Sequence, residues 1–415
     1  MTKLRFTRRN VLRTGVAGGA AVAAGSLFMP AVHAQASTKI GYVTPATGPL
    51  AGFAEADDFV IGNIRDMFAS KGVEIVVKDT QSSPARAAEV TQELIAEGVS
   101  MVLVASTPET TNPTASVCEA NQVPCISSVA PWQPYFFGQG GDPATGFNYS
   151  YHFFWGLEDL MAVFAGMWNQ LDTNKKVGGL FPNDGDGNAW GGAFPGFFGA
   201  QGYEIVDPGR YENLNSDFSS QISAFQSAGV DILTGVPIPP DFTTFWKQAL
   251  AQGMKPKAAS IGKAILFPVA VEALGNDGHN LSSEVWWTPS HPFTDSLLGL
   301  SAADVAGAYT SATGRQWTQP IGFVHALFEV ADRVMETAGT GADDVAEALS
   351  TLSMDTVVGP VDWTSGPVKN VSKTPLVGGQ WRGDGNGNGK YDMVITENAL
   401  ASNIALQGSM EPIFG

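Results

Sequence analysis

One acidic side chain interrupts an apolar segment: Glu284 stands just before a pair of tryptophans in LSSEVWWTPSHPF, residues 281–293. A carboxylate beside aromatic surface must be solvated, paired with a cation or protonated at a cost in free energy. A cation held against Glu284 and the indole of Trp286 or Trp287 would gain about 0.5–2 kcal/mol of cation–π attraction. That cation is either a Lys or Arg of the protein itself, for example Lys263, or a group on a bound ligand.

Motifs of the common enzyme classes are missing from the chain. It contains no G-x-S-x-G, H-E-x-x-H or Walker motif, and no G-x-G-x-x-G follows the first predicted strand. The five histidines are scattered along the sequence. We therefore expect a protein that binds without catalysing a reaction, and we expect no cofactor.

Two loops rich in glycine and aspartate, 184–188 and 384–392, resemble calcium-binding loops. The second loop has acidic and amide side chains at alternating positions, but Ile395 stands where a calcium loop places its twelfth-position Glu. Glycine and asparagine in such a segment also favour a tight turn between two strands. We favour the turn, so no metal site is predicted.

Aromatic side chains recur just after predicted strands. They are Phe53, Trp132, Trp190 and Trp286. In an open α/β sheet, ligands bind beyond the carboxyl ends of the strands. Aromatic residues in loops at that edge have little core to enter, so we predict that they wall a ligand site. The alternative is that they fill the hydrophobic core.

The elements that would position these residues alternate as strand and helix. The run VSMVLVAS is typical of a strand buried on both faces of a parallel sheet, and a helix with Ser83 as N-cap and Pro84 as first residue precedes it. A second round of strand and helix begins near Trp155. The pattern predicts an α/β protein of two doubly wound, Rossmann-like lobes.

The first 36 residues differ in composition from the rest. They hold five basic residues and no acidic one, followed by an apolar run rich in Ala and Gly that ends in small residues suited to cleavage. The pair Arg8-Arg9 with the apolar residues after it resembles a twin-arginine export signal. No cysteine follows that could carry a lipid anchor. We expect a soluble, exported, periplasmic protein.

The net charge limits the classes of binding partner, and the two cysteines bear on disulfide formation. The net charge of −17 makes nucleic acid and anionic membranes poor partners. The only cysteines, Cys118 and Cys125, leave two possibilities open. They form a short-loop disulfide in an oxidising compartment, or they are two buried thiols.

Four segments together carry a family resemblance: KIGYVTPATGPLAGF, VKDTQSSPARAAEVTQELI, VPCISS and VVGPVDW. They resemble the leucine/isoleucine/valine-binding proteins, which are solute receptors of ABC importers with the type I periplasmic-binding fold. The resemblance implies two α/β lobes joined by three chain crossings, an inner-membrane ABC permease as partner, and a monomer. The implied boundaries are 1–36 for the signal, 37–155 with 289–358 for lobe 1, and 156–288 with 359–415 for lobe 2.

The same resemblance implies roles for individual residues. Glu284 matches the family's acid that pairs with the amino group of the ligand, and Phe53 and Trp190 match aromatic positions in the site. Hydroxyls of the first lobe would hold the ligand's carboxylate; the matching residues are Thr110, Thr111, Ser127 and Ser128. The chain departs from the pattern at Ala130-Pro131-Trp132, where the family usually offers a further Thr and where proline has no N–H to donate.

The expected solute is a branched-chain or aromatic amino acid. The extra tryptophans and the departure at 130–132 keep two alternatives open. One is a receptor for an aromatic acid or an amide- or urea-type solute. The other is a sensory ligand-binding module of the same fold.

Overall fold

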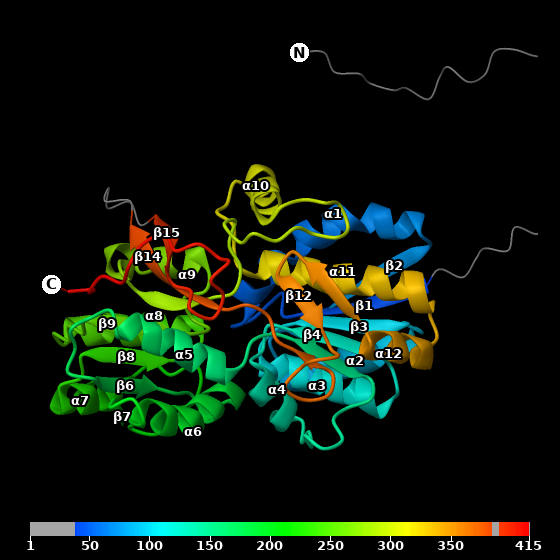
Figure 1. The fold of residues 1–415 in the computed structure, drawn as a ribbon. Coiled ribbons are helices and arrows are strands. Elements are labelled where there is room, and N and C mark those ends of the chain that lie inside the picture. Colours follow the sequence, from blue (N-terminus) through cyan, green and yellow to red (C-terminus); the bar gives the residue numbers. More distant parts are fainter. Residues whose placement is uncertain (1–37, 384–389, 415) are drawn as a thin grey trace, which may run out of the picture. The chain divides into compact units, whose positions relative to one another are not determined.

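The computed structural model describes residues 38–383 and 390–414, which belong to one compact unit of the chain. Two lobes, each built on its own sheet, make up this unit (Figure 1). The predicted export signal (1–36) and most of the predicted calcium-like loop (384–389) lie outside the described residues. The two-lobed α/β fold predicted from the sequence is confirmed.

Lobe 1 holds a sheet with the strand order β13-β5-β4-β3-β1-β2, in which all neighbours are parallel. Its strands are β1 (Thr38–Thr44), β2 (Val73–Asp79), β3 (Met101–Ala105), β4 (Cys125–Ser128), β5 (Ser150–Phe153) and β13 (Val371–Ser372). Its helices are η1 (Ala51–Ala54), α1 (Asp57–Ser70), α2 (Pro84–Ala96), α3 (Pro108–Ala120), α4 (Trp132–Gly138), α10 (Ala302–Thr313), α11 (Pro320–Ala338) and α12 (Ala342–Ser350). A hairpin of β11 (Ser353–Thr356) and β12 (Gly359–Asp362) follows α12.

Lobe 2 repeats this topology and extends it. Its sheet runs β15-β14-β10-β9-β8-β6-β7, and only β14 and β15 pair antiparallel with their neighbours. The strands are β6 (Lys176–Leu180), β7 (Glu204–Val206), β8 (Ile232–Gly235), β9 (Ala258–Ile261), β10 (Ser282–Val285), β14 (Val377–Gly383) and β15 (Tyr391–Glu397). The helices are α5 (Leu157–Trp168), α6 (Gly185–Gly199), α7 (Ser219–Ala228), α8 (Pro239–Ala251), α9 (Pro268–Glu272) and η2 (Gly275–Gly278).

Local sequence explains these elements. Every residue of β3 is buried, as a strand covered on both faces requires. Ser83 caps α2 by accepting a hydrogen bond from the N–H of Arg86, and Pro84 is the first helical residue. Gly229 ends α7 in the left-handed conformation that glycine adopts without strain.

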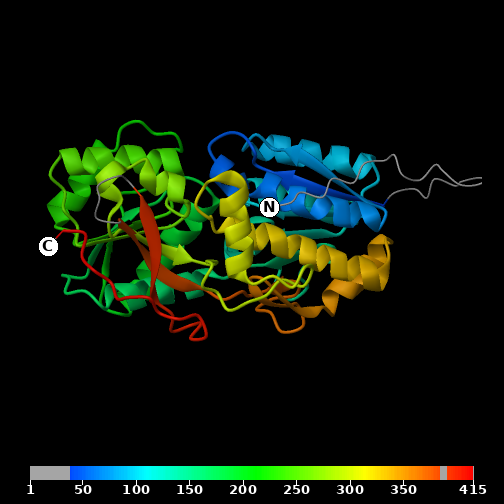
Figure 2. The same ribbon diagram turned by 90° about the horizontal axis from the view of Figure 1, so that it is seen from above.

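The chain passes between the lobes three times, after β5, after β10 and after β13 (Figures 1 and 2). We propose that the first two passages mark the lobe boundaries near 155 and 288 that the sequence predicts. The third differs, because Val371 and Ser372 still pair with β5 in the sheet of lobe 1. The two-residue strand β13 gives too short an apolar pattern to be read in the sequence. We propose that residues 359–372 belong to lobe 1 and that lobe 2 resumes at Val377.

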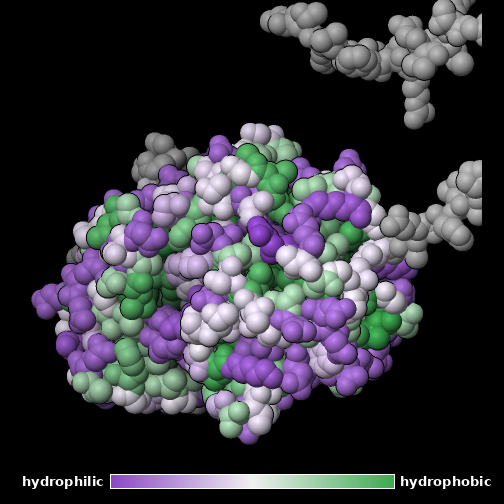
Figure 3. All heavy atoms as spheres, turned by 45° about the vertical axis from the view of Figure 1, so that its right-hand side comes forward, coloured by the Kyte–Doolittle hydropathy of each residue, from purple (hydrophilic) through white to green (hydrophobic). Residues whose placement is uncertain are grey.

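The core runs through both lobes and across the crossings, and Trp168, Trp246 and Trp381 are among its largest buried side chains. Apolar patches on the face shown in Figure 3 are small and are separated by hydrophilic residues. Among the described residues, no helix combines the length and apolarity needed to cross a membrane. Cys118 on α3 and Cys125 on β4 are both buried as free thiols.

Candidate functional site

A small cavity lies between the lobes where strands of both sheets end, and we call it the deep cavity. Its volume is about 20 Å³, which is enough for about one water molecule. From lobe 1 its wall includes Phe53, Thr107, Val129 and Pro131, which follow β1, β3 and β4. The remaining wall residues are Phe154, Trp155, Asp186, Trp190, Val236, Lys263, Leu266, Glu284 and Trp286. The arrangement follows the rule that ligands bind beyond the carboxyl ends of parallel strands.

Glu284 lies in β10 and is only 2% exposed. Its Oε2 accepts a hydrogen bond from the hydroxyl of Ser283 at 2.9 Å, and its Oε1 accepts the backbone N–H of Lys263 at 3.4 Å. Burial raises the pKa of Glu284 to about 8, with the nearby charge of Asp186 acting in the same direction. Glu284 is therefore mostly a neutral acid at pH 7 until a cation comes close enough to stabilise its ionised form.

The ammonium of Lys263 is held by carboxylates other than that of Glu284, so Lys263 is not the cation that pairs with Glu284. Its Nζ lies 2.8 Å from Asp186 Oδ2, 3.1 Å from Asp184 Oδ2 and 3.9 Å from Glu109 Oε2. We call these four side chains the Lys263 cluster. Lys263 is 3% exposed and has φ of 59°, a left-handed conformation that is strained for a residue with a side chain.

The acids of the Lys263 cluster outnumber its single base. Burial alone would lower the pKa of Lys263, but Asp184, Asp186 and Glu109 together raise it well above its usual value. Burial and the neighbouring carboxylates raise the pKa of Asp186, although Lys263 acts against them. The cluster therefore keeps Lys263 charged and leaves the cavity with an excess of acid.

Several polar atoms on the cavity wall are buried without a hydrogen-bond partner among the described residues. They are the indole Nε1 atoms of Trp155, Trp190 and Trp286, the hydroxyl of Thr107 and Oδ1 of Asp186. Buried polar groups are normally hydrogen-bonded, and each one left unpaired costs about 1–3 kcal/mol. Three N–H donors and a hydroxyl are thus available to acceptor groups of a solute, and a carboxylate oxygen is available to a donor.

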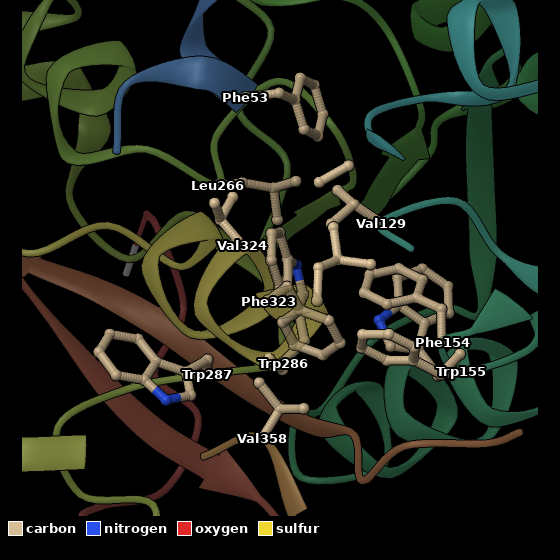
Figure 4. Packing of buried hydrophobic residues seen from close by; sticks show 14 of the residues in the cluster. Phe53, Val129, Phe154, Trp155, Leu266, Trp286, Trp287, Phe323, Val324 and Val358 are labelled. Carbon is tan, nitrogen blue, oxygen red and sulfur yellow. The ribbon is translucent and has the colours of Figure 1, made fainter. Parts of the chain in front are cut away.

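Aromatic packing holds the indoles in place. The ring of Trp286 packs edge-on against Phe154 and Phe323, with centroids 5.4 and 5.1 Å apart, and Trp155 lies beside Phe154 (Figure 4). Trp190 stacks on Phe194 at 4.9 Å. These contacts fix the direction of the N–H groups because the rings cannot turn without losing buried contact area.

Gly262 allows Trp190 to approach Glu284. A Cβ atom on Gly262 would lie 2.4 Å from Cη2 of Trp190 and 3.1 Å from Oε1 of Glu284. No side chain fits at that distance unless the indole moves. The glycine therefore helps to set the size and shape of the cavity.

The residues predicted from the sequence divide into two groups. The structure places Phe53, Trp190, Glu284 and Trp286 on the wall of the deep cavity. It does not bring Thr110, Thr111, Ser127, Ser128, Ala130 or Trp132 there. Trp287 lies apart from the wall in Figure 4 and donates its N–H to the carbonyl of Val357.

The residues of the second group already use their polar atoms in hydrogen bonds within the protein. The hydroxyl of Thr110 donates to Ser106 Oγ at 2.7 Å, and Thr111 donates to the Ser106 carbonyl at 2.9 Å. On β4, Ser127 and Ser128 donate to carbonyls of β5. The carbonyl of Ala130 contacts Nε2 of His152. Trp132 donates its indole N–H to Glu158 Oε1 at 3.2 Å, which ties α4 to α5.

Sequence reasoning missed wall residues of two kinds. Thr107 is the N-cap residue of α3, two residues past the end of β3 and three before the predicted Thr110, so the N-cap position between strand and helix was the signal to follow. Lys263 was named only as a possible partner of Glu284 and Asp186 only as part of the calcium-like loop 184–188, because a charge in a loop is usually solvated and does not indicate a cavity wall. Trp155 was noted only as the start of the second lobe.

A much larger opening, which we call the outer groove, lies between α3 and α4 of lobe 1 and α5 and α6 of lobe 2. Its volume is about 1110 Å³. Leu50, Phe137, Met161, Ala189 and Leu214 are among the apolar residues on its walls. Glu109 and Asp184 also line it, so the Lys263 cluster has members on the walls of both the groove and the deep cavity.

Two lobes with matching sheets, three crossings and a polar cavity between the strand ends define a two-lobed solute-binding protein. The family profile described as "Periplasmic binding protein" matches residues 37–386, and the chain belongs to that family. These proteins bind solutes and are not enzymes, in agreement with the expectation from the sequence. No curated protein matches the chain.

Solved structures share the fold at low sequence identity. The leucine-binding protein LivK of Thermotoga maritima matches with a TM-score of 0.71 and 18% identity over 86% of this chain and 97% of its own. A closed leucine-, isoleucine-, valine-, threonine- and alanine-binding protein of Brucella ovis gives 0.72 and 18% over 89% and 96%. An ABC-transporter solute-binding protein of Rhodopseudomonas palustris in complex with 3,4-dihydroxybenzoic acid gives 0.71 and 18% over 87% and 96%.

Proposed function

We propose that this protein is an exported receptor of an ABC importer and that the deep cavity binds an amino acid with an apolar or aromatic side chain. The family and the fold support the receptor role, and the similar structures include two amino-acid-binding proteins and one solute-binding protein in complex with 3,4-dihydroxybenzoic acid. The basic, signal-like first 36 residues support export. An inner-membrane permease is the partner that this role requires.

One observation carries the choice of an amino acid: Glu284 is buried, and no cationic side chain is bonded to it among the described residues. Lys263, the cation on the cavity wall, is already held by carboxylates. An ammonium group on a solute would supply the missing positive charge and let Glu284 ionise. A hydrogen bond between charged groups of this kind contributes about 1.5–3 kcal/mol.

The other end of an amino acid also finds suitable groups. A carboxylate accepts hydrogen bonds, and the cavity offers the hydroxyl of Thr107 and unpaired indole N–H groups. Aromatic and aliphatic side chains such as Phe53, Val129 and Leu266 supply an apolar surface. A cavity of about 20 Å³ is too small for any amino acid, so the walls must separate on binding, as a hinge of three crossings permits.

The indole donors also support a second candidate, an aromatic acid. With Glu284 neutral, its O–H and the N–H groups of Trp155, Trp190 and Trp286 would all donate to acceptors on such a solute. Within the part of the chain that the structure describes, no basic side chain free of an ion pair lines the cavity to neutralise the acid's charge, and for this reason we place the aromatic acid second.

Matched solutes separate the two candidates. We would measure thermal shifts and calorimetric affinities for phenylalanine and leucine, for the acids that lack the amino group, for the amines that lack the carboxylate, and for 3,4-dihydroxybenzoate. Bound solute raises the melting temperature by mass action. We expect the amino acids to bind at least about tenfold more tightly than either partial analogue. Binding of the aromatic acids without binding of the amino acids would replace the proposal with the second candidate.

A further inference from the structure

Glu109 joins the two lobes at a point far from the hinge in sequence. It lies in the first turn of α3 in lobe 1, whereas every other member of the Lys263 cluster belongs to lobe 2. Its Oε1 accepts the backbone N–H of Gly185 at 3.0 Å, and its Oε2 lies 3.9 Å from the ammonium of Lys263. A single carboxylate of lobe 1 therefore engages an N–H donor and a cation that both belong to lobe 2.

The partners of Glu109 are arranged within lobe 2 alone. Gly185 begins the 15-residue helix α6, whose first N–H groups lack partners inside the helix and attract negative charge. Asp184 occupies the N-cap and accepts the N–H of Gly187 at 2.8 Å, so it satisfies a different donor. Asp184 and Asp186 hold Lys263 in place. When the lobes open, Glu109 moves away with lobe 1. The two groups that bind its carboxylate, the N–H of Gly185 and the ammonium of Lys263, stay in place within lobe 2.

The contact also lies at the boundary between the two openings. Lys263 and Asp186 line the deep cavity, and Glu109, Asp184 and Gly185 line the outer groove. A solute that enters through the groove therefore meets this contact next to the cavity. Other polar contacts between the lobes lie near the crossings, where a hinge rotation moves atoms least. Trp132 and Gln133 bond Glu158 beside the first crossing, and Gln319 bonds the backbone of Trp286 beside the second.

We propose that Glu109 is a positioning residue that latches lobe 1 to the start of α6 and to Lys263, and so holds the lobes closed over the deep cavity without a solute. Part of the free energy of closure then comes from the protein itself. Because the closed cavity holds only about one water molecule, the contact must break to admit a solute, and it therefore lowers the apparent affinity for that solute by the free energy of the latch. The proposal does not depend on which solute binds.

The test uses the ligand-free protein and two substitutions of the same residue. Glu109→Gln keeps an acceptor for Gly185 but loses the charge, and Glu109→Ala loses both. Small-angle scattering and an inter-lobe distance measured with spin labels on exposed surfaces report the closed fraction. We expect the ratio of closed to open protein to fall about tenfold in the alanine variant and by a smaller factor in the glutamine variant.

Glu97→Gln is the matched control. Glu97 forms an ion pair at 2.8 Å with Lys78 inside lobe 1, so this substitution makes the same change in charge without touching the contact between the lobes. We expect its scattering curve and inter-lobe distance to equal those of the wild type. Two results would overturn the proposal: a ligand-free wild-type protein that is already open, or Glu109 variants that remain as closed as the control.

Discussion

The two lobes have the same strand topology, but they contribute different chemistry to the deep cavity. On the lobe 1 wall, Phe53, Thr107, Val129 and Pro131 are all uncharged. On the lobe 2 wall, Asp186, Lys263 and Glu284 are all ionisable, and Trp190 adds an indole donor. In the proposed site, lobe 2 would therefore select a solute's charge, whereas lobe 1 would supply shape, one hydroxyl and, through Glu109, the proposed contact between the lobes.

The difference has an energetic basis. Buried charges are tolerated only when neighbouring groups compensate them, so the charged residues must be supported from a single lobe if they are to survive opening. Lys263 with Asp184 and Asp186 meets that condition, since all three belong to lobe 2. The neutral wall of lobe 1 can be exposed and covered again at little electrostatic cost.

We expect the largest effect, a loss in the free energy of unfolding, from Lys263→Met. This substitution tests whether the stability of lobe 2 depends on its buried cation. The substitution leaves Asp184 and Asp186 buried without their partner, and removal of one member of a buried ion pair costs about 3–5 kcal/mol. Urea denaturation measures the loss in the free energy of unfolding. Lys257→Met is the control, because Lys257 is 43% exposed in its pair with Asp231 and should cost at most about 1 kcal/mol.

Equal losses in these two variants would contradict the view that the Lys263 cluster is a buried electrostatic unit of lobe 2.

Glu284→Gln should weaken amino-acid binding about 10- to 100-fold, because a charge-assisted hydrogen bond is lost. The same substitution should raise the folding stability of the ligand-free protein at about pH 8, although it weakens binding. Burial raises the pKa of Glu284 from its usual 4.5 to about 8 in the folded state, so the folded state binds more protons between these values and stability falls as pH rises through that range. The ligand-free variant should therefore melt at a higher temperature than the wild type at about pH 8.

Calorimetry and thermal melts at two pH values measure both effects for Glu284→Gln. Unchanged affinity would remove Glu284 from the site, and a lower melting temperature at the higher pH would show that its burial is compensated in another way.

Gly262→Ala tests whether the lobe 2 wall is packed tightly around Trp190. The new methyl group would push the indole away from Glu284, and such overpacking costs about 1–3 kcal/mol. We expect solute affinity to fall about tenfold, with a shift in tryptophan fluorescence. Gly192→Ala on α6, where a Cβ meets nothing within 4 Å, should leave affinity unchanged. Full affinity in Gly262→Ala would show that the cavity does not depend on the position of this indole.

Thr107→Val should have the smallest effect, because lobe 1 contributes one neutral hydroxyl and a neutral hydrogen bond is worth about 0.5–1.5 kcal/mol. Affinity for an amino acid should fall by about tenfold or less. Thr111→Val is the matched comparison, since its hydroxyl donates to the Ser106 carbonyl inside lobe 1. It should lower stability and leave affinity unchanged. The reverse pattern would place the carboxylate-binding hydroxyl on α3, as the sequence alone implied.

The fold could be predicted because alternation of buried strands and capped helices is a local pattern. The run at 101–105 and the Ser83-Pro84 helix start are read directly from the sequence. Glu284 and three of the wall aromatics could be found because a charge inside an apolar segment, or an aromatic residue after a strand, needs a special environment. The third crossing could not be placed, because β13 consists of two residues and is defined only by its pairing with β5.

The Lys263 cluster could not be predicted either. Glu109, Asp184, Asp186 and Lys263 are separated by up to 154 positions, and each looks like a solvated loop residue until the fold brings them together. The sequence also could not show which hydroxyls are free. The hydroxyls of Thr110 and Thr111 both bond Ser106 just before α3, whereas the hydroxyl of Thr107 has no partner among the described residues.

Proton release on binding tests the central claim most directly, namely that a solute's ammonium lies against Glu284 of lobe 2. Calorimetry of phenylalanine or leucine at about pH 6.5, in buffers with different ionisation enthalpies, counts the protons. With the pKa of Glu284 at about 8, binding of a cation should release about one proton, and affinity should rise up to about tenfold per pH unit until about pH 8. The release should disappear in Glu284→Gln. Binding without proton release at about pH 6.5, or an affinity that falls as pH rises toward and above about 8, would show that Glu284 binds as a neutral donor and would contradict the account.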